Sequence, residues 1–216
     1  MSPTYVALDL ETTGLNPERD TILEIGAVKF RDDKVLDTWS SLVNPQRPIP
    51  YKITQLTGIH QEEVEQAPFL NSIAGSLMRF VQNYPIIGHN VSFDLGFLNR
   101  HGLCLNNPSI DTFELASILM PHASRYSLGM LAEALGILFP SRHRALDDAL
   151  ATKDLFLALF QRAIELDMAT LQEINRLAAH LDWPLRHVFQ DAERAKARTA
   201  FTGSIGQQLK AKGVLD

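Results

Sequence analysis

The sequence predicts an α/β sandwich built on a mixed sheet, and the order of its apolar segments carries that prediction. Three strand-like segments follow one another near the start, at 5–10, 22–30 and 35–43. Beyond residue 50, short strand candidates alternate with helical patterns instead. Strands that first form a meander and then alternate with helices are typical of helices packed on a mixed sheet. With 45% hydrophobic and 21% charged residues, the chain also has the composition of a folded protein.

Each element has its own local signal. The apolar runs at 22–30 and 35–43 flank a polar turn at 31–34, which predicts a hairpin. Three prolines between 45 and 50 predict an extended crossing segment, and a short helical turn at 54–58 follows it. Later in the chain, apolar spacing predicts helices at 69–81, 93–101, 112–119, 127–135 and 145–165, with strands at 86–89 and 109–111.

Charge and composition exclude several classes of protein. Twenty Lys and Arg against 25 Asp and Glu give a net charge of -5, which argues against a strongly basic nucleic-acid footprint. No apolar run approaches the roughly 18 residues of a membrane span, and the N-terminus lacks a signal-peptide pattern. We therefore expect a cytoplasmic protein without a membrane partner. Cys104 is the single cysteine, which excludes an internal disulfide and a zinc site built on several thiolates.

The charge is unevenly distributed and suggests a division of the chain. Residues 1–165 carry 13 basic and 19 acidic residues, a net charge of -6, whereas residues 166–216 carry 7 and 6, a net charge of +1. The longest helical pattern ends near residue 165, and two further helices are predicted at 168–181 and 188–198. We expect a main domain over 1–165 and a helical C-terminal extension or linker over 166–216.

Asp9 and Glu11 are the first candidates for chemistry. They lie two residues apart, so in a strand both carboxylates project from the same face of the sheet. Neighbouring anions repel, and partial burial adds to the cost of ionising either of them. A bound divalent cation is the simplest way to keep both charged, although two acids at an exposed strand end would also fit this short pattern.

A second polar cluster, at 89–94, follows the strand candidate at 86–88 and opens a helix. The ends of strands are where α/β proteins place ligand sites. Asp94 lies in the first turn of that helix, where a carboxylate also favours the positive end of the helix dipole.

The third cluster lies at 143–148, at the start of the longest predicted helix. Asp147 and Asp148 differ by about 100° around the helix axis, so only one of them can point into a shared site. His143 precedes the helix. A lone histidine there would be a surface loop residue, but beside several carboxylates its imidazole is suited to act as a general base near neutral pH.

Taken together, the three clusters resemble the motifs of the DEDDh family of 3'-to-5' exonucleases, the group that contains the proofreading subunit of bacterial DNA polymerase III. Residues 9–14, 89–94 and 143–148 match its three motifs in order. The resemblance extends over about residues 5–165. Segments between the motifs also fit, namely Glu24 to Val28, Asn44-Pro45, Leu56 to Ile59 and Asp111-Thr112.

This resemblance implies a ribonuclease H-like fold, a five-stranded mixed sheet with its second strand antiparallel and helices on its faces. It implies an exonuclease domain that releases nucleoside 5'-monophosphates by a two-metal mechanism. The ligands of two divalent ions, Mg²⁺ or Mn²⁺, would be Asp9, Glu11, Asp94 and Asp148. His143 would deprotonate the attacking water. The residues placed near the substrate would be Thr12, Thr13, Leu56 and Thr57 at the 3' end, with Phe93 beneath the ribose or base.

The expected substrates are single-stranded DNA ends, and RNA 3' ends remain open because no motif settles recognition of a 2'-hydroxyl. A non-catalytic nucleic-acid-binding module is a second hypothesis, which the complete set of four acids and one histidine disfavours. A third is a nuclease domain of a larger replication or repair assembly with a polymerase or helicase partner or fused domain. The C-terminal extension vaguely resembles the connection in exonuclease and helicase fusions.

Overall fold

The computed structural model describes residues 3–138 and 143–200. Two compact units divide the chain, Met1–Leu159 and Phe160–Asp216, and helix α7 (Ala145–Glu165) contributes residues to both. The predicted division at residue 165 stays a prediction, and residues 201–216 of the predicted extension lie outside the described residues.

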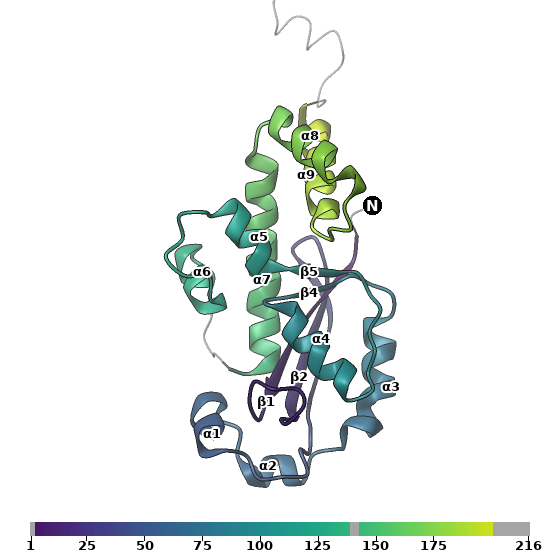
Figure 1. Cartoon of the computed structure of the whole chain (residues 1–216), viewed down its shortest axis with the longest axis vertical. Helices are drawn as coiled ribbons and strands as arrows, with labels where there is room; N and C mark the ends of the chain where they lie inside the picture. Colours follow the sequence, from purple (N-terminus) through teal and green to yellow (C-terminus); the bar gives the residue numbers. More distant parts are fainter. Residues whose placement is uncertain (1–2, 139–142, 201–216) are drawn as a thin grey trace, which may run out of the picture. The chain divides into compact units, whose positions relative to one another are not determined.

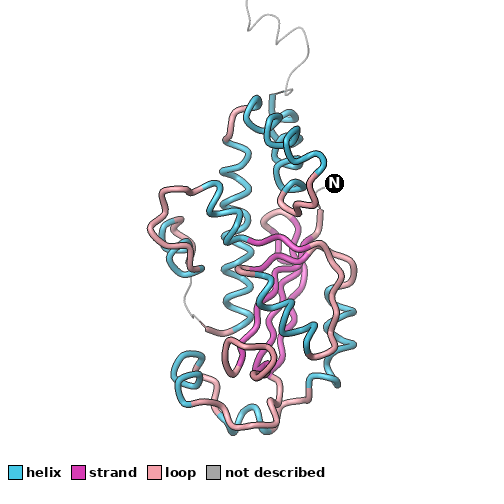
Figure 2. The backbone as a smooth tube through the Cα atoms, in the orientation of Figure 1, coloured by secondary structure: helices cyan, strands magenta, loops and turns pink. Residues whose placement is uncertain are grey.

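The first unit is built on a five-stranded sheet (Figures 1 and 2). Its strands are β1 (Tyr5–Thr12), β2 (Ile22–Arg31), β3 (Lys34–Leu42), β4 (Ile86–Gly88) and β5 (Ser109–Asp111). The strand order is β3-β2-β1-β4-β5. β2 is antiparallel to both of its neighbours, while β1, β4 and β5 run parallel. The predicted mixed sheet with an antiparallel second strand is therefore confirmed.

The two faces of the central strand β1 pack against different helices. Val6, Leu8 and Leu10 belong to a core cluster that also contains residues of α3 (Leu70–Val81) and α4 (Val91–Arg100). Side chains alternate along a strand, so the residues between them face the opposite side. On that side Tyr5 packs against the Phe156 ring of α7, with ring centroids 5.2 Å apart. The acidic residues of β1 share this second face.

The described residues of the first unit also form four shorter helices: α1 (Tyr51–Thr57), α2 (Gln61–Glu65), α5 (Thr112–Leu119) and α6 (Leu128–Ala134). α1 ends at Gly58, whose φ of 70° is the left-handed conformation that favours glycine. The sequence does not predict α2, which has five residues and buries only Val64. The Glu63 carboxylate accepts a hydrogen bond from His60 N at 2.8 Å and so holds the first turn of α2.

The second unit contains the end of α7, α8 (Met168–Leu177), a 3₁₀ turn at Ala178–His180, and α9 (Arg186–Ala200). Asp167 caps α8 by accepting a hydrogen bond from Thr170 N at 2.8 Å. The buried Phe189 ring stacks on Trp183. The helix predicted over 168–181 is shorter than expected because its last turn tightens into the 3₁₀ geometry. Among the described residues, no helix combines the length and apolar character that crossing a bilayer requires.

Candidate active site

The carboxylates of β1 lie on the face that carries the start of α7. Asp9 is paired with Gly26 and Glu11 with Glu24 in the antiparallel register of β1 and β2. Residues directly opposite in such a pair project to the same face. Three carboxylates, those of Asp9, Glu11 and Glu24, therefore share one small area, and Glu11 and Glu24 are 8% and 5% exposed.

Asp94 reaches the end of β1 from the first turn of α4. It is 3% exposed, and its Oδ1 accepts a hydrogen bond from Leu10 N at 3.0 Å. The start of α4 is itself held by Asp111, whose carboxylate accepts hydrogen bonds from Asn90 N at 3.0 Å and from Val91 N at 3.2 Å. Asp111 also accepts one from Phe113 N, at the start of α5. One carboxylate thus fixes two helix ends.

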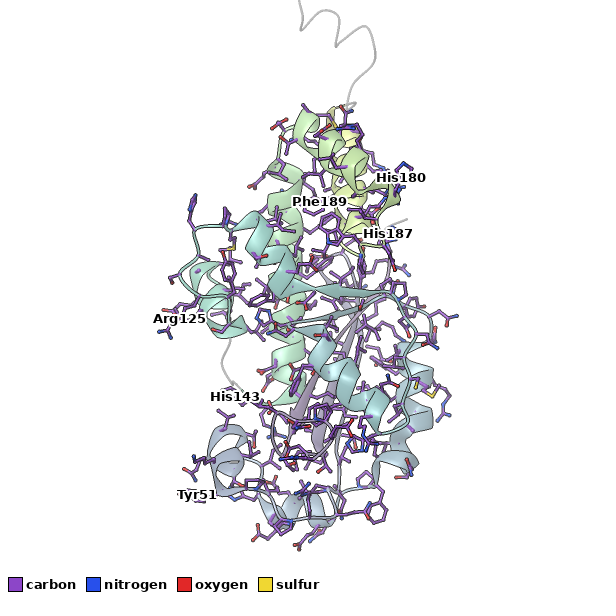
Figure 3. The ribbon with its side chains drawn as sticks, viewed as in Figure 1. Tyr51, Arg125, His143, His180, His187 and Phe189 are labelled. Carbon is purple, nitrogen blue, oxygen red and sulfur yellow. The ribbon has the colours of Figure 1, made fainter. Side chains whose placement is uncertain are left out.

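His143 lies in the loop just before α7 (Figure 3). Asp148 lies in the first turn of that helix. Ligand atoms of Glu11, His143 and Asp148 all lie within 4.8 Å of one another, and Asp147 is not part of this group. His143 has a φ of 65°, a left-handed conformation unusual for a residue other than glycine. Its backbone N donates to Asp148 Oδ1 at 3.2 Å. The loop and the helix therefore place both side chains beside Glu11.

Burial and mutual repulsion raise the pKa values of the carboxyls of Asp9, Glu11 and Asp94. Desolvation, followed by repulsion from Asp148 and Glu24, raises the pKa of Glu11 to about 8. The pKa of Asp9 is raised well above its usual value by burial first and by Asp94 next. Burial also raises the pKa of Asp94, although the hydrogen bond from Leu10 N opposes that shift. Crowded, buried carboxylates bind protons more readily unless a cation neutralises their charge.

The donor set fits a hard divalent cation. The converging groups are carboxylates and one imidazole, and oxygen donors are what Mg²⁺ and Mn²⁺ prefer. A bound cation would also relieve the repulsion that raises the pKa values of Asp9, Glu11 and Asp94.

This electrostatic arrangement predicts how thermal stability varies with pH. With chelator present, the folded chain holds protons on Glu11 between its unfolded pKa of about 4.3 and its folded pKa of about 8, where the unfolded chain has lost them. The Tm in EDTA is therefore expected to fall as the pH rises through this range. Mg²⁺ should raise the Tm most at the alkaline end. Scanning calorimetry at several pH values tests this, and a Tm in EDTA that rises with pH would contradict it.

The predicted substrate residues are divided between buried and exposed positions. Thr12, Thr13 and Thr57 are buried. Their hydroxyls are engaged within the protein: Thr12 Oγ1 donates to Gly14 O, Thr13 Oγ1 accepts from Thr21 N, and Thr57 Oγ1 donates to Ile53 O. Leu56 is half exposed, whereas Phe93 packs against the core and lies 4.9 Å from the Phe97 ring.

Asp111 and Glu24 help to hold the site together, and the sequence indicates them only as parts of the family resemblance. Asp111 had a usable signal, since an Asp between a strand and a helix is a typical N-cap. Glu24 had none, because its partners Arg144 and Ala145 lie 120 and 121 residues further along the chain. His89, the first residue of the second cluster, has a structural role. Its Nε2 lies 2.7 Å from Tyr126 O, and burial lowers its pKa.

Comparison with known proteins identifies the family. Residues 6–156 match the family described as Exonuclease (RNase T). The chain is 38% identical over 193 residues to a PolC-type DNA polymerase III of Clostridium perfringens, covering 85% of this chain and 13% of that protein. It is 33% identical over 196 residues to the 3'-5' exonuclease DinG of Staphylococcus aureus, covering 88% of this chain and 22% of that protein. The chain thus spans less than a quarter of the length of these curated relatives.

A solved structure agrees with the sequence comparisons. Exonuclease X in complex with 5' overhanging duplex DNA is similar with a TM-score of 0.62 and 28% identity, over 73% of this chain and 91% of that one. The chain belongs to the exonuclease family, and its first unit contains an exonuclease domain. The family resemblance and the ribonuclease H-like fold predicted from the sequence are confirmed, and divalent metal ions are the cofactor class of this family.

Proposed function

We propose that this chain is a metal-dependent 3'-to-5' exonuclease that releases nucleoside 5'-monophosphates from single-stranded DNA ends. The observation that carries the proposal is the convergence of Glu11, His143 and Asp148 within 4.8 Å on an exonuclease fold. The relatives named above include a 3'-5' exonuclease and a DNA polymerase III, which favours DNA and this polarity.

Each polar group has a proposed role. The carboxylates that would hold the ions are those of Asp9, Glu11, Asp94 and Asp148. When bound, two Mg²⁺ or Mn²⁺ ions supply Lewis-acid stabilisation of the negative charge that develops on the phosphate. His143 would take the proton from the attacking water, since an imidazole changes charge near neutral pH. Its backbone hydrogen bond to Asp148 holds the residue beside Glu11 and Asp148.

The terminal nucleotide would lie between the end of β1 and α1. The residues proposed to contact it are Thr12, Thr13, Leu56, Thr57 and Phe93. Leu56 presents a half-exposed apolar side chain, which suits contact with a base or ribose. Because the three threonine hydroxyls already have protein partners, these residues would contact the nucleotide mainly through other atoms.

A degradation assay on the full chain tests the proposal. End-labelled single-stranded DNA, duplex DNA and RNA are incubated with Mg²⁺, with Mn²⁺ or with EDTA. We expect stepwise shortening of single-stranded DNA from the 3' end in either metal and none in EDTA. Faster shortening of RNA would instead identify an exoribonuclease of the same family. Oligonucleotide binding with no cleavage in either metal would favour a non-catalytic module.

The C-terminal extension, residues 166–216, is proposed to join the exonuclease domain, residues 1–165, to a polymerase or helicase partner or fused domain. The net charge of -6 over residues 1–165 provides little sign of a long basic track, and phosphate neutralisation supplies most non-specific nucleic-acid affinity. An exonuclease with weak binding gains from attachment near its substrate, because attachment raises the effective concentration. The length of the relatives, of which this chain covers 13% and 22%, supports a larger assembly.

Truncation tests this division. A chain ending at Glu165 keeps all of the site residues, so its metal-dependent turnover on short oligonucleotides is expected to stay within about twofold of the full chain. Turnover and thermal melting of both chains are compared. An unfolded or inactive truncated chain would show that residues 166–216 are part of the catalytic domain.

A further inference from the structure

We propose that Glu24 and Arg144 form a positioning pair that fixes the backbone of His143 for catalysis. The Glu24 carboxylate accepts hydrogen bonds from Arg144 Nε at 3.1 Å and from Arg144 Nη2 at 2.8 Å. This two-bond geometry restrains the orientation of a guanidinium as well as its distance. The Glu24 side chain is 6% exposed and that of Arg144 is 43% exposed, so the pair is anchored from the protein interior.

The same carboxylate also holds the start of α7. Ala145 N donates to Glu24 Oε2 at 3.0 Å. Backbone N–H groups in the first turn have no partner within their own helix, so Glu24 caps α7 from the neighbouring strand. Gly26, two residues further along β2, allows the close approach, because a Cβ there would clash with the backbone of Ala145 and Leu146. The helix start therefore rests directly on β2.

His143 depends on these anchors because its own conformation is unfavourable. A φ of 65° is sterically unfavourable for a non-glycine residue, and such residues persist only where their surroundings hold them. On one side, His143 N is bonded to Asp148 Oδ1. On the other side, the next two residues are bonded to Glu24. Without the Arg144 anchor, the backbone is free to relax to a negative φ, which would move the imidazole away from Glu11 and Asp148.

Charge explains why both members of the pair are needed. Glu24 lies directly opposite Glu11, and like charges opposite each other in a sheet are destabilising. Arg144 offsets this repulsion. Removing Arg144 alone leaves a buried, unpaired carboxylate beside Glu11, whereas removing both charges leaves no such group. Stability and positioning can therefore be separated by mutation.

The inference rests on the proposed function, and the experiment distinguishes the two. The full-length variants are Arg144→Met, Arg144→Lys, Glu24→Gln/Arg144→Met and His143→Ala. In the double variant, the amide that replaces the Glu24 carboxylate keeps an oxygen that can accept from Ala145 N. Arg100→Met, which removes an exposed pair with Glu18, is the control. Tm, kcat and KM are measured on a labelled single-stranded oligonucleotide, and binding of an oligonucleotide with a non-hydrolysable 3' end is measured against salt concentration.

We expect Arg144→Met to lower the Tm and to reduce kcat about 10- to 100-fold with KM nearly unchanged. Arg144→Lys keeps the charge but loses the two-bond geometry, so it should fold normally with an intermediate kcat. The double variant should recover the Tm but not kcat. Arg100→Met should leave kcat within about twofold, since exposed ion pairs contribute little.

Two results obtained with the Arg144 variants would overturn the inference. The first is a double variant, or an Arg144→Lys variant, with wild-type kcat. The second is a raised KM in Arg144→Met together with a weaker salt dependence of oligonucleotide binding, in which the slope of log K against log salt concentration falls in magnitude by about one. That result would make Arg144 a phosphate contact. In both cases an inactive His143→Ala variant leaves the proposed function intact. If His143→Ala is as active as the wild type, the proposed role of His143 fails and the inference fails with it.

Discussion

Replacing Asp148 by Asn is expected to lower turnover about a thousandfold, which corresponds to about 4 kcal/mol of transition-state stabilisation. The substitution keeps the shape of the side chain and removes its charge. An Asn Oδ1 can still accept the hydrogen bond from His143 N, so the start of α7 should remain folded. What is lost is a carboxylate from the group formed with Glu11 and His143.

Asp147→Asn is the matched control for this prediction. The two residues are neighbours with the same side chain, but Asp147 is not part of the converging group and should retain turnover within about twofold. Single-turnover rates in Mg²⁺, with circular dichroism to verify folding, provide the comparison. The reverse ranking of the two variants would assign the metal ligand to Asp147.

His143→Ala is expected to lower kcat by about 10² to 10⁴, the usual contribution of a general base. Binding of Mg²⁺ and of an oligonucleotide with a non-hydrolysable 3' end should stay close to wild type, because the proposed metal ligands are the four carboxylates. Alanine replaces one non-glycine residue by another at the same left-handed position, so the backbone strain is similar in both chains.

The control is His180→Ala, which removes an exposed histidine of the second unit. It should leave kcat and both binding constants unchanged. Isothermal titration with Mg²⁺ and kinetics at saturating substrate separate binding from turnover. A His143→Ala variant that binds neither metal nor oligonucleotide but has normal chemistry at saturation would assign His143 to binding instead.

Most of the fold could be predicted because its elements carry strong local signals. The strand at 22–30 was predicted one residue short of β2, and the helix at 145–165 matches α7. These segments combine apolar periodicity with clear polar boundaries. The end of α8 could not be predicted, because Leu177 and Leu181 continue the apolar spacing although both are about 60% exposed. Spacing alone does not distinguish a buried leucine from an exposed one.

The candidate site was predictable as a set of motifs but not as an arrangement. Strand alternation placed Asp9 and Glu11 on one face, and helix geometry allowed only one of Asp147 and Asp148 to join them. The left-handed conformation of His143 has no sequence signal, because a glycine would be the usual indication. It depends on tertiary contacts, and these are visible only once β2 and α7 are folded together.

The alternation along β1 has a consequence for how this chain tolerates insertion and deletion. Val6, Leu8 and Leu10 form part of the core, while Asp9 and Glu11 face the start of α7. A one-residue slip of this strand would turn carboxylates into the hydrocarbon interior and leucines towards the metal ligands. Both faces therefore specify the same alignment, and a misaligned chain would lose its core together with its chemistry. An insertion or deletion of one residue between 5 and 11 would therefore disrupt both the core and the candidate site. The loop at 13–20 lies outside this strand and does not carry both constraints.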